Sequence, residues 1–519
     1  MNTKALRQKI LDLAIRGKLV PQDPNDEPAE VLLERIRKQK QQMLKEGKLK
    51  KKDIKNDTII FKGEDNLHYE KFQDGTVKCI EDEIPFEVPE GWAWSRLNSI
   101  VDVRDGTHDT PTYVDKGIPL ITSKNLVEGG IDYSNVKYIS EKDAISINER
   151  SGVNIGDILF AMIGTIGNPS MVTEDILISI KNVALFKFTF SKNLSNHFVM
   201  YFLDYAQEDM KNKPSGGLQP FVSLNFLRTY LVPVPPVEEQ QRIVSILADS
   251  INKIRNIDVL KNELTASVEK AKSKILDLAI RGKLVPQDPN DEPASVLLER
   301  IRTEKEELIK QGKIKRDKKE SVIFKGEDNS YYEKIGDKVS EYMGEDLPLG
   351  WSIASFSQVN MFSAETIDPS HFPEKMFELY SVPNFELGVP EIIKGQEIGS
   401  SKQSICENDV LVCKINPRIN RVWITRHITS YPILGSSEWV VFRNDYLYAP
   451  YMQFYFLAPY FRELLLSNVS GVGGSLMRAQ PESVKKYPIW VPPYKEQVRI
   501  AEKITELFIK FDDIEKSLS

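Results

Sequence analysis

Apolar side chains recur at a helical period through the middle of the chain. From Ile243 to Leu278, ten intervals between successive apolar positions together span 35 residues. A mean step of 3.5 residues is typical of the seam of a coiled coil. At 1.5 Å per residue the predicted helix is about 55 Å long. Both chain ends carry shorter stretches of the same pattern, so two stripes can bury each other as an antiparallel pair. The alternative is an isolated amphipathic helix on each globular part.

The chain contains a long internal repeat. Residues 9–37 and 274–302 are identical over 29 positions except that Ser295 stands where Glu30 does, at an offset of 265. A second block, 234–243, matches 491–500 at an offset of 257. Near-identity of this length does not arise by chance, so the chain is a duplication.

The two offsets extend to the chain ends. Ser519 corresponds to Asn262 and Met1 to Ala266, so only residues 263–265 lack a counterpart. The termini therefore correspond to two halves of one element that the middle of the chain carries intact. This predicts a circularly permuted duplication with pseudo-twofold symmetry, in which the two terminal helices lie end to end.

Between the repeats lie two domains that share little sequence. Strand-like apolar runs occur at 158–163 and 183–188 in the first and at 410–415 and 439–442 in the second. Each domain then has an apolar helical stretch, at 198–205 and 451–466. We therefore expect a mixed α/β (α+β) fold, with two divergent domains separated by an antiparallel coiled coil of long helices. The expected boundaries are 1–60 (helical repeat), 61–235 (first domain), 236–322 (central helical region), 323–492 (second domain) and 493–519 (helix completing the repeat).

Composition narrows the class of protein without selecting a function. The net charge is −6, with 41% hydrophobic residues and three cysteines, Cys79, Cys406 and Cys413. No apolar run approaches the ~20 residues of a membrane-spanning helix, and no Cys/His cluster has zinc spacing. The basic N-terminal helix could pass for a targeting sequence, but it recurs internally, which favours a structural role. We expect a cytoplasmic protein with no membrane contact.

Lysine runs end both second helices of the repeat, at 48–52 and 313–319. Such a run is usually a solvated helix end, and contact with phosphate groups is the alternative reading. The two divergent domains are nearly neutral, with 13 basic and 15 acidic side chains in 95–229 and 12 and 13 in 352–486. Because phosphate neutralisation dominates affinity for DNA, these domains alone would bind DNA weakly unless their basic groups cluster or a partner adds charge.

Polar residues beside glycine, proline and other turn residues form candidate DNA-contacting loops. Lysine, arginine and asparagine are the side chains that pair with guanine and adenine edges, and the densest group is the loop 414–421. For each residue alone, a turn side chain facing water is the competing explanation. The candidates are Thr107, His108, Lys124, Asn125, Lys213, Ser215, Gln219, Lys414, Asn416, Arg418, Asn420, Arg421, Arg478 and Gln480.

The sequence lacks the motifs of common catalytic sites. There is no Gly-x-x-x-x-Gly-Lys-Ser/Thr phosphate loop and no strand followed by Gly-x-Gly for a dinucleotide or S-adenosylmethionine. Val491-Pro-Pro-Tyr494 lacks the polar first residue of the amino-methyltransferase motif, and its counterpart is Val234-Pro-Pro-Val237. We therefore expect no catalytic residues, no metal site and no cofactor in this chain.

Several of these motifs together resemble a known family. The Pro-Pro-x-x-Glu-Gln-x-x-Ile signature at Pro235 and Pro492, the repeated helix, and Ile10-Leu-Asp-Leu-Ala-Ile-Arg-Gly-Lys-Leu19 are similar to the specificity (S) subunits of Type I restriction-modification systems. Gly106-Thr-His-x-Thr-Pro111 and Gly156-Asp-Ile-Leu159 resemble segments of the family's first target-recognition domain. The second domain departs from this pattern, because Asn408-Asp replaces Gly-Asp and the Thr-His-x-Thr-Pro segment is absent.

The resemblance implies a function that composition does not show. Each target-recognition domain would read one half of a split sequence in double-stranded DNA, and the helices would fix the spacing between the halves. The helices would also bind two methyltransferase (M) subunits, and restriction (R) subunits could join them. S-adenosylmethionine, ATP and Mg would then be bound by those partners. The alternatives are a non-catalytic coiled-coil scaffold that holds two protein-binding domains and, disfavoured by the missing cofactor loop, a methyltransferase.

Overall fold

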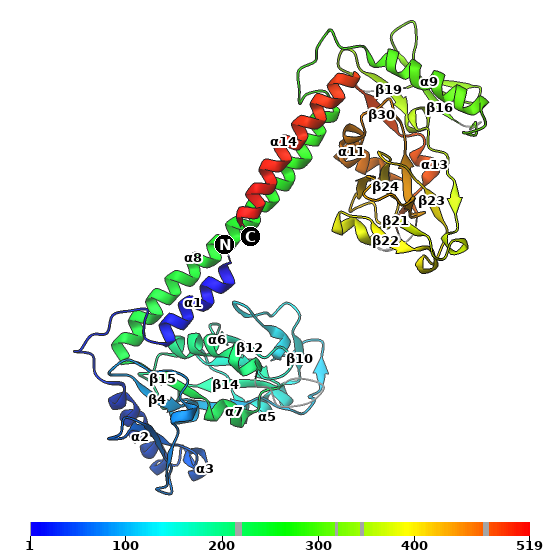
Figure 1. The fold of residues 1–519 in the computed structure, drawn as a ribbon. Helices are drawn as coiled ribbons and strands as arrows, with labels where there is room; N and C mark the ends of the chain where they lie inside the picture. The colour runs from blue at the N-terminus through cyan, green and yellow to red at the C-terminus, as the bar shows by residue number, and fades with distance from the viewer. Residues whose placement is uncertain (1, 213–220, 317–319, 343–346, 471–476, 519) are drawn as a thin grey trace. The chain divides into compact units, whose positions relative to one another are not determined.

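The computed structural model describes residues 2–212, 221–316, 320–342, 347–470 and 477–518 (Figure 1). The chain divides into two compact units, Met1–Leu260 (unit 1) and Lys261–Ser519 (unit 2). A continuous 44-residue helix, α8 (Val237–Ile280), contributes its first part to unit 1 and its second part to unit 2. The boundary between the units therefore falls inside one helix.

In unit 1 the N-terminal helix α1 (Thr3–Ile15) lies antiparallel to the first part of α8 (Figure 1). Near the start of α1, Thr3 Oγ1 donates a hydrogen bond to Asp258 Oδ1 at 2.7 Å. Near its end, Leu11 belongs to the same buried cluster as Ile243. The apolar stripe of the sequence thus becomes a buried helix–helix contact within this unit.

Unit 2 contains the equivalent pair. Helix α14 (Tyr494–Leu518) lies antiparallel to the second part of α8 (Figure 1). Lys272 Nζ bonds Asp512 Oδ1 at 2.9 Å, and Leu276 and Ile504 belong to one buried cluster. Each part of α8 is therefore covered by the terminal helix of its own unit.

After the helix pair, each unit has a second helix and a small antiparallel sheet. In both copies the helix starts after a proline, and its first amide donates to a glycine carbonyl of the following domain at 2.8 Å (Ala29 N to Gly91 O, Ala294 N to Gly350 O). The strand orders are β1-β2-β3 and β16-β17-β18. The elements are α2 (Ala29–Lys45), α3 (Lys51–Ile54), β1 (Ile59–Lys62), β2 (His68–Lys71) and β3 (Val77–Cys79) in unit 1, and α9 (Ala294–Lys310), β16 (Ser321–Lys325), β17 (Tyr331–Ile335) and β18 (Lys338–Glu341) in unit 2.

The divergent domain of unit 1 is built on two four-stranded sheets, β12-β11-β14-β5 and β13-β7-β10-β6, with the pair β15-β4 closing it near α8. The central strands β11 and β14 are buried along their whole length, which explains their continuous apolar runs. The strands are β4 (Ala93–Arg96), β5 (Asp102–Asp105), β6 (Tyr113–Val114), β7 (Ile118–Ile121), β8 (Leu126–Val127), β9 (Gly130–Ile131), β10 (Lys137–Ile139), β11 (Ile158–Ala161), β12 (Gly167–Met171), β13 (Ser179–Ile180), β14 (Val183–Lys187) and β15 (Leu231–Val234).

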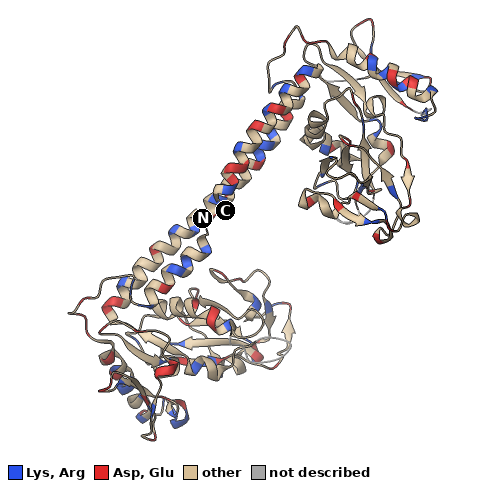
Figure 2. Ribbon diagram, viewed as in Figure 1, with Lys and Arg blue, Asp and Glu red and all other residues tan. Residues whose placement is uncertain are grey.

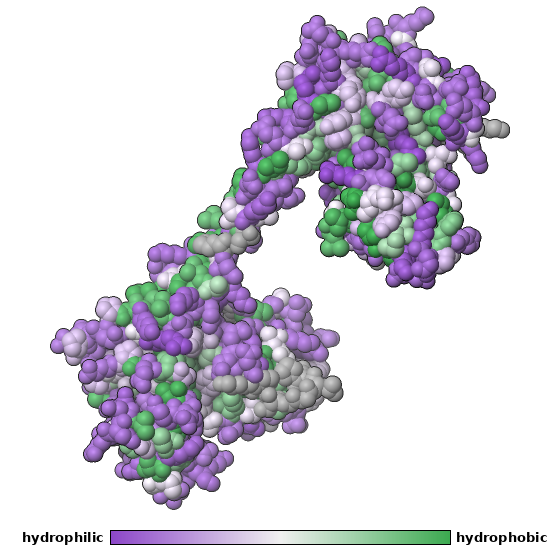
Figure 3. Space-filling model, in the orientation of Figure 1, coloured by the Kyte–Doolittle hydropathy of each residue, from purple (hydrophilic) through white to green (hydrophobic). Residues whose placement is uncertain are grey.

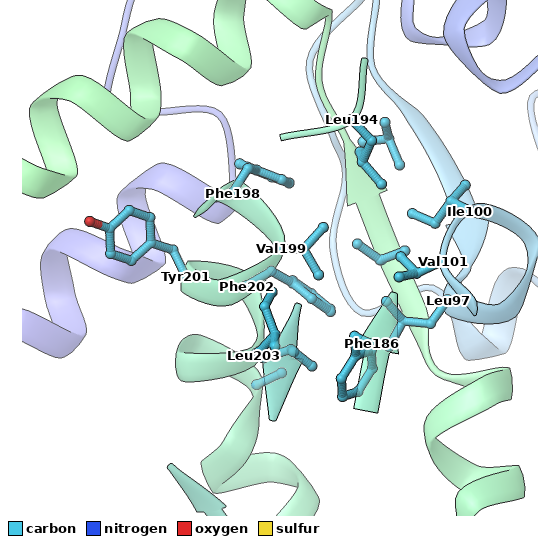
Figure 4. Packing of buried hydrophobic residues seen from close by; sticks show 14 of the residues in the cluster. Leu97, Ile100, Val101, Phe186, Leu194, Phe198, Val199, Tyr201, Phe202 and Leu203 are labelled. Carbon is cyan, nitrogen blue, oxygen red and sulfur yellow. The ribbon is translucent and has the colours of Figure 1, made fainter. Parts of the chain in front are cut away.

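Helices cover this domain and complete its core. Side chains of α6 (Asn196–Asn212) pack on Phe186 of β14, on Leu97 of the short helix α4 (Leu97–Ile100) and on Val101, which follows that helix (Figure 4). Burial of the large apolar side chains in this layer, each worth about 2 kcal/mol, makes it the main core of unit 1. The remaining helices are α5 (Glu141–Ser151) and α7 (Leu224–Thr229).

The divergent domain of unit 2 repeats the central strand pairings of unit 1, although its two sheets, β25-β24-β27 and β20-β23-β26-β21-β22, have three and five strands where those of unit 1 have four each. β24 pairs antiparallel with β25 and β27, as β11 does with β12 and β14, and β21 pairs parallel with β26, as β7 does with β13. The strands are β19 (Ser352–Ser355), β20 (Thr366–Ile367), β21 (Met376–Tyr380), β22 (Glu391–Lys394), β23 (Lys402–Ser404), β24 (Val410–Cys413), β25 (Val422–Ile424), β26 (Ile433–Gly435), β27 (Trp439–Phe442), β28 (Val469–Ser470), β29 (Arg478–Ala479) and β30 (Pro488–Val491). The helices are α10 (Phe356–Val359), α11 (Ala449–Leu457), α12 (Pro459–Ser467) and α13 (Pro481–Val484).

The mixed α/β prediction is confirmed, with one difference in the second domain. The stretch expected as a single helix over 451–466 is two helices, because Ala458 takes an extended conformation (φ −63°, ψ 146°) directly before Pro459. Among the described residues, no helix is long and apolar enough to cross a membrane.

Candidate nucleic-acid interface

In unit 1, several strands end along one edge of the divergent domain. Ala161, the last residue of β11, is paired with Val183, the first of β14, and the ends of β7 and β13 are paired at Ile121 and Ile180. The loop after β5 lies beside these strand ends, because Thr107 forms an isolated β-bridge with Lys181. We call the loops 106–109, 122–125, 162–166 and 181–182 the strand-end surface of unit 1.

His108 is held in this surface while remaining open to solvent. Its Nδ1 lies 2.8 Å from Asn182 Oδ1 and its Nε2 lies 3.0 Å from Asp105 Oδ2. The other carboxylate oxygen of Asp105 accepts a hydrogen bond from Arg150. The His108 side chain is 58% exposed, so its ring has a fixed orientation and remains accessible to a ligand.

Asp105 is the buried acidic group that orients these residues. Burial acts to raise its pKa, but the hydrogen bonds from Arg150 and His108 outweigh burial and leave the pKa of Asp105 below its usual value. The ionised carboxylate therefore accepts from both side chains. Asp105 positions His108 rather than facing outward itself.

The neighbouring loop contributes one exposed lysine. Lys124 is exposed, and Ser123 Oγ donates to Asn182 O at 3.3 Å. Lys181 Nζ donates to Thr110 Oγ1 at 3.0 Å. The structure thus brings together Thr107, His108 and Lys124, three of the residues predicted from sequence, with Lys181 and Asn182, which the sequence motifs did not single out.

One predicted residue of this surface, Asn125, is buried. Asn125 is 6% exposed, and its Oδ1 accepts from Thr122 N at 3.0 Å while its Nδ2 donates to Asp132 O at 3.2 Å. Its amide is used inside the loop, so in this conformation it does not face a base. Lys213, Ser215 and Gln219 lie outside the described residues. Phe221, the first described residue after them, is paired by a β-bridge with Ile163 on the same surface.

Unit 2 has an equivalent strand-end surface. Cys413, the last residue of β24, is paired with Trp439, the first of β27, and Ile415 is bridged to Arg478 as Ile163 is to Phe221. The loops 414–421, 436–438 and 477–480 therefore occupy the place that the unit 1 loops occupy. The loop that the sequence made the strongest candidate lies on this surface.

Backbone hydrogen bonds fix the basic residues of the unit 2 surface. Lys414 N donates to Glu438 O, and Asn416 N donates to Met477 O, both at 2.9 Å. Arg478 forms an ion pair with Glu438 at 3.1 Å, and its side chain is 56% exposed. Arg418 is exposed as well.

Three other predicted residues of unit 2 differ in the solvent exposure of their side chains. Asn420 is 9% exposed, has a φ of +54°, and donates to Phe456 O and Leu457 O at 3.1 Å, so its side-chain amide nitrogen is engaged within the protein. The Arg421 side chain is 17% exposed and pairs with Glu386 at 3.3 Å. Gln480 is exposed at the start of α13.

The Gly-Asp and Asn-Asp motifs have the same structural role in the two units. Gly156 and Asn408 both have positive φ, +84° and +66°, a conformation that glycine and asparagine tolerate. Asp157 bonds Lys187 Nζ at 2.5 Å, and Asp409 accepts two hydrogen bonds from Arg443 at 2.7 and 2.6 Å. The replacement of glycine by asparagine in unit 2 therefore preserves the turn.

The Pro-Pro-x-x-Glu-Gln signature joins the repeat to the divergent domain. Glu239 accepts from Gln22 Nε2 at 3.0 Å and from Trp92 Nε1 at 2.9 Å, and Gln240 Nε2 donates to Pro235 O at 2.9 Å. Unit 2 repeats these bonds through Glu496 and Gln497, at 3.1, 3.1 and 2.9 Å. Burial raises the pKa of both glutamates. The signature is structural and does not form part of either strand-end surface.

No group of three or more His, Cys, Asp or Glu side chains in the described part of the chain is arranged to hold a metal ion. The two strand-end surfaces carry lysine, arginine, histidine and asparagine side chains, together with hydroxyl groups and the acidic residues Asp109 and Glu438. Basic and amide groups of this kind bind phosphate oxygens and base edges.

Comparison with known proteins finds relatives of one kind. Residues 89–266, which include the whole strand-end surface of unit 1, match the model of the Type I restriction modification DNA specificity domain. The chain is 26% identical to the Type I restriction enzyme EcoEI specificity subunit of Escherichia coli, over 99% of this chain and 90% of that protein. It is 32% identical to the EcoAI specificity subunit of Escherichia coli, over 61% of this chain and 58% of that protein.

A solved structure shares the fold. A chain from a study of complex assembly and conformational transition of the type I R-M system superposes with a TM-score of 0.52 at 15% identity, covering 84% of this chain and 94% of that chain. The sequence relatives and the domain match agree with the motifs found in both units. The chain is therefore similar over nearly its whole length to a Type I restriction enzyme specificity subunit, and its residues 89–266 match the model of the DNA specificity domain.

Proposed function

We propose that this chain is a specificity subunit that reads a bipartite DNA target, with one half read by the strand-end surface of each unit. The observation that carries the proposal is that the same place in two equivalent folds carries different side chains. Unit 1 presents His108, Lys181 and Asn182, and unit 2 presents Lys414 and Arg478. A surface that differs between two copies on a nearly identical framework fits an asymmetric target.

The side chains at these surfaces have the chemistry of base recognition. An arginine such as Arg478 can bond both acceptors of guanine, and an asparagine such as Asn182 or Asn416 can bond adenine, each good pair being worth about 1–3 kcal/mol of discrimination. Lysines such as Lys124 act on phosphates, which fix orientation and carry no sequence information. The two kinds of contact predict two kinds of mutant behaviour.

The proposal includes a role for the helices. By the repeat offsets, α1 and α14 correspond to two halves of α8, which is the expected outcome of a circularly permuted duplication. In this proposal the helices form an antiparallel coiled coil whose length sets the spacing between the half-sites. The continuity of α8 from Val237 to Ile280 supports it.

We further propose that the helices bind two methyltransferase subunits and that restriction subunits can join the complex. S-adenosylmethionine, ATP and Mg are assigned to those partners, and the complex to the cytoplasm. The relatives are named as subunits of Type I restriction enzymes, which supports an assembly. Hydrophobic surface along α8 supports a binding role for the helices (Figure 3), because Val259 and Leu260 are 50% and 62% exposed.

A domain exchange tests the proposal. Residues 90–235 are replaced by the corresponding domain of another specificity subunit, and bound sequences are selected from randomised DNA with the original and exchanged chains. We expect one half of the selected sequence to change and the other half to stay. A change in both halves, or in neither, would contradict the assignment, and an original chain without sequence preference would favour a protein-binding scaffold.

A further inference from the structure

The second helix of unit 1 ends in a concentrated basic surface. Residues 38–55 contain eight lysines against one glutamate and one aspartate, in a chain whose net charge is −6. Figure 2 shows lysines gathered around α2 and α3. The exposed members near the end of α2 and on α3, which we call the lysine cluster, are Lys45, Lys48, Lys50, Lys51, Lys52 and Lys55.

One buried lysine fixes this segment to the divergent domain. Lys40 is 3% exposed, lies 2.6 Å from Asp57 Oδ2, and donates to Asn98 O at 3.0 Å. Its ammonium also lies 4.5 Å from the ring centre of Phe190. The end of α2 is therefore anchored, and the lysine cluster projects from a defined position into solvent.

The repeat supplies an internal comparison. At the offset of 265, Lys40 corresponds to Lys305, which is likewise partly buried and bonds Glu320 at 2.5 Å and the carbonyl of Ser357. The anchoring contact is therefore kept in both units. The surface around it differs, because Gln39, Gln41 and Gln42 of unit 1 are replaced by Glu304, Glu306 and Glu307 in unit 2.

These glutamates offset the basic groups of the second copy. Glu306 accepts from Arg316 and Glu307 lies 3.9 Å from Lys310. Figure 2 shows acidic and basic residues interspersed along α9. Over residues 303–320, which correspond to 38–55, unit 2 has seven basic and five acidic side chains, against eight basic and two acidic in unit 1, so net positive charge is concentrated in unit 1.

We propose that the lysine cluster of unit 1 is a sequence-independent contact for the phosphate backbone of DNA, and that the equivalent place in unit 2 is not. The inference rests on the proposed DNA-reading function. Charge complementarity favours a polyanion, since the divergent domains are nearly neutral and phosphate neutralisation supplies most of the affinity for DNA. The cluster lies near Asn98, just before β5, whereas the reading surface lies at the other end of that strand. It therefore contacts DNA outside the bases that unit 1 reads.

The repeat also supplies matched variants. K48Q/K50Q in unit 1 and K313Q/K315Q in unit 2 change equivalent exposed lysines, so both should leave folding intact. Binding of the full-length chain to a DNA duplex containing its selected target, and to a duplex without it, is measured as a function of salt concentration. A third variant, K50Q/K51Q/K52Q, removes more of the lysine cluster.

The expected result is specific to unit 1. K48Q/K50Q should lower affinity for both duplexes by the same factor, roughly tenfold at 0.1 M salt, and reduce the slope of log K against log salt by about 0.9 for each phosphate that the variant no longer neutralises. K313Q/K315Q should change the slope by less than half as much as K48Q/K50Q does. The triple variant K50Q/K51Q/K52Q should lower the affinity and the slope more than K48Q/K50Q does. The preference for the target should be unchanged throughout.

Three results would overturn the inference: unchanged slopes for both unit 1 variants, equal effects in the two units, or loss of affinity for the target duplex alone. Unchanged DNA binding together with loss of association with co-purifying protein would assign the lysine cluster to an acidic protein partner instead. If the unaltered chain shows no sequence preference, the proposed reading function fails, and that result is distinct from the behaviour of the lysine variants.

Discussion

Asn182 connects two loops of the unit 1 strand-end surface. It takes a positive φ of +56° in the turn between β13 and β14, contacts the ring of His108 through its side chain, and donates from its backbone to Thr107 O at 3.2 Å. The ammonium of its neighbour Lys181 donates to the hydroxyl of Thr110. The two adjacent residues are therefore suited to different tasks, base recognition and phosphate contact.

Replacing each of them should separate these tasks. We expect N182A to relax selection at one position of one half-site, with a loss of about 1–3 kcal/mol of discrimination. K181A should weaken binding to all sequences by a similar factor and lower the salt dependence. Selection from randomised DNA and titrations at several salt concentrations measure the two effects. Equal loss of discrimination in K181A and N182A would contradict the distinction.

A buried ion pair gives a pH-dependent prediction at the same scale. Burial raises the pKa of Asp57 to about 6, although Lys40 opposes the shift. The unfolded value is near 3.9, so the contribution of this group to stability is fully present below about pH 4 and is lost as the pH rises through 6. The stability advantage of the wild type over D57N should therefore shrink between pH 4.5 and 7, by about 1–3 kcal/mol. Denaturant unfolding of the wild type and D57N at pH 4.5 and at pH 7 measures this change. A stability difference between the two proteins that is the same at both pH values would show that the pKa of Asp57 is not raised.

Among the elements, the turn after the first helix of each repeat is tightly constrained in both copies. Gly17 and Gly282 both have a φ of +64°, and a Cβ built on either would lie 2.4 Å from a proline side chain, Pro89 or Pro348. This explains why the sequence of the turn is identical in the two copies. The turn brings Gln22 and Gln287 to the buried glutamates of the Pro-Pro-x-x-Glu-Gln signature.

A glycine pair separates steric clash from backbone strain. Gly47 also has a positive φ, +72°, but a Cβ there would meet nothing within 4 Å. We expect G47A to destabilise unit 1 by about 1 kcal/mol through backbone conformation alone, and G17A by roughly 3 kcal/mol or more because Pro89 must also move. Thermal unfolding of the two variants checks this, and equal destabilisation would mean that Pro89 relaxes without cost.

The sequence predicted the elements better than the orientation of their side chains. Continuous apolar runs predicted β11, β14, β24 and β27 because central strands are buried on both faces. Periodicity likewise predicted α8. Polar loop residues could not be sorted in this way, because whether an asparagine faces solvent or bonds within the protein depends on the folded path of its own loop, as at Asn125, or on a distant segment, as at Asn420. The sequence therefore did not show that the side chains of Asn125 and Asn420 bond within the protein, or that Asn182 lies beside His108.

At the scale of the whole molecule, the two units share a fold while differing in the residues at their strand-end surfaces. The framework of helix pair, small sheet and signature bonds is repeated with the same hydrogen-bond pattern. The divergent domains keep the strand pairing and change what the loops present. This division is the expected outcome if the framework determines assembly and spacing and the loops determine the target.

Lengthening α8 tests the proposed role of the helices. Four residues inserted near Asn262 add about one helical turn, or ~6 Å. We expect the insertion to lengthen the spacer that the chain accepts between half-sites, or to abolish binding. Selection from randomised DNA with variable spacers measures the change. Full activity on the unaltered spacer would show that α8 does not set the spacing.

The central claim is that the two strand-end surfaces read different halves of one target. Its most direct test is selection from randomised DNA with two double variants, H108A/N182A in unit 1 and N416A/R478A in unit 2, each beside the wild type. Each variant should lose sequence information in one half-site only, and the two variants in opposite halves. Loss in the same half, in both halves, or in neither would contradict this claim.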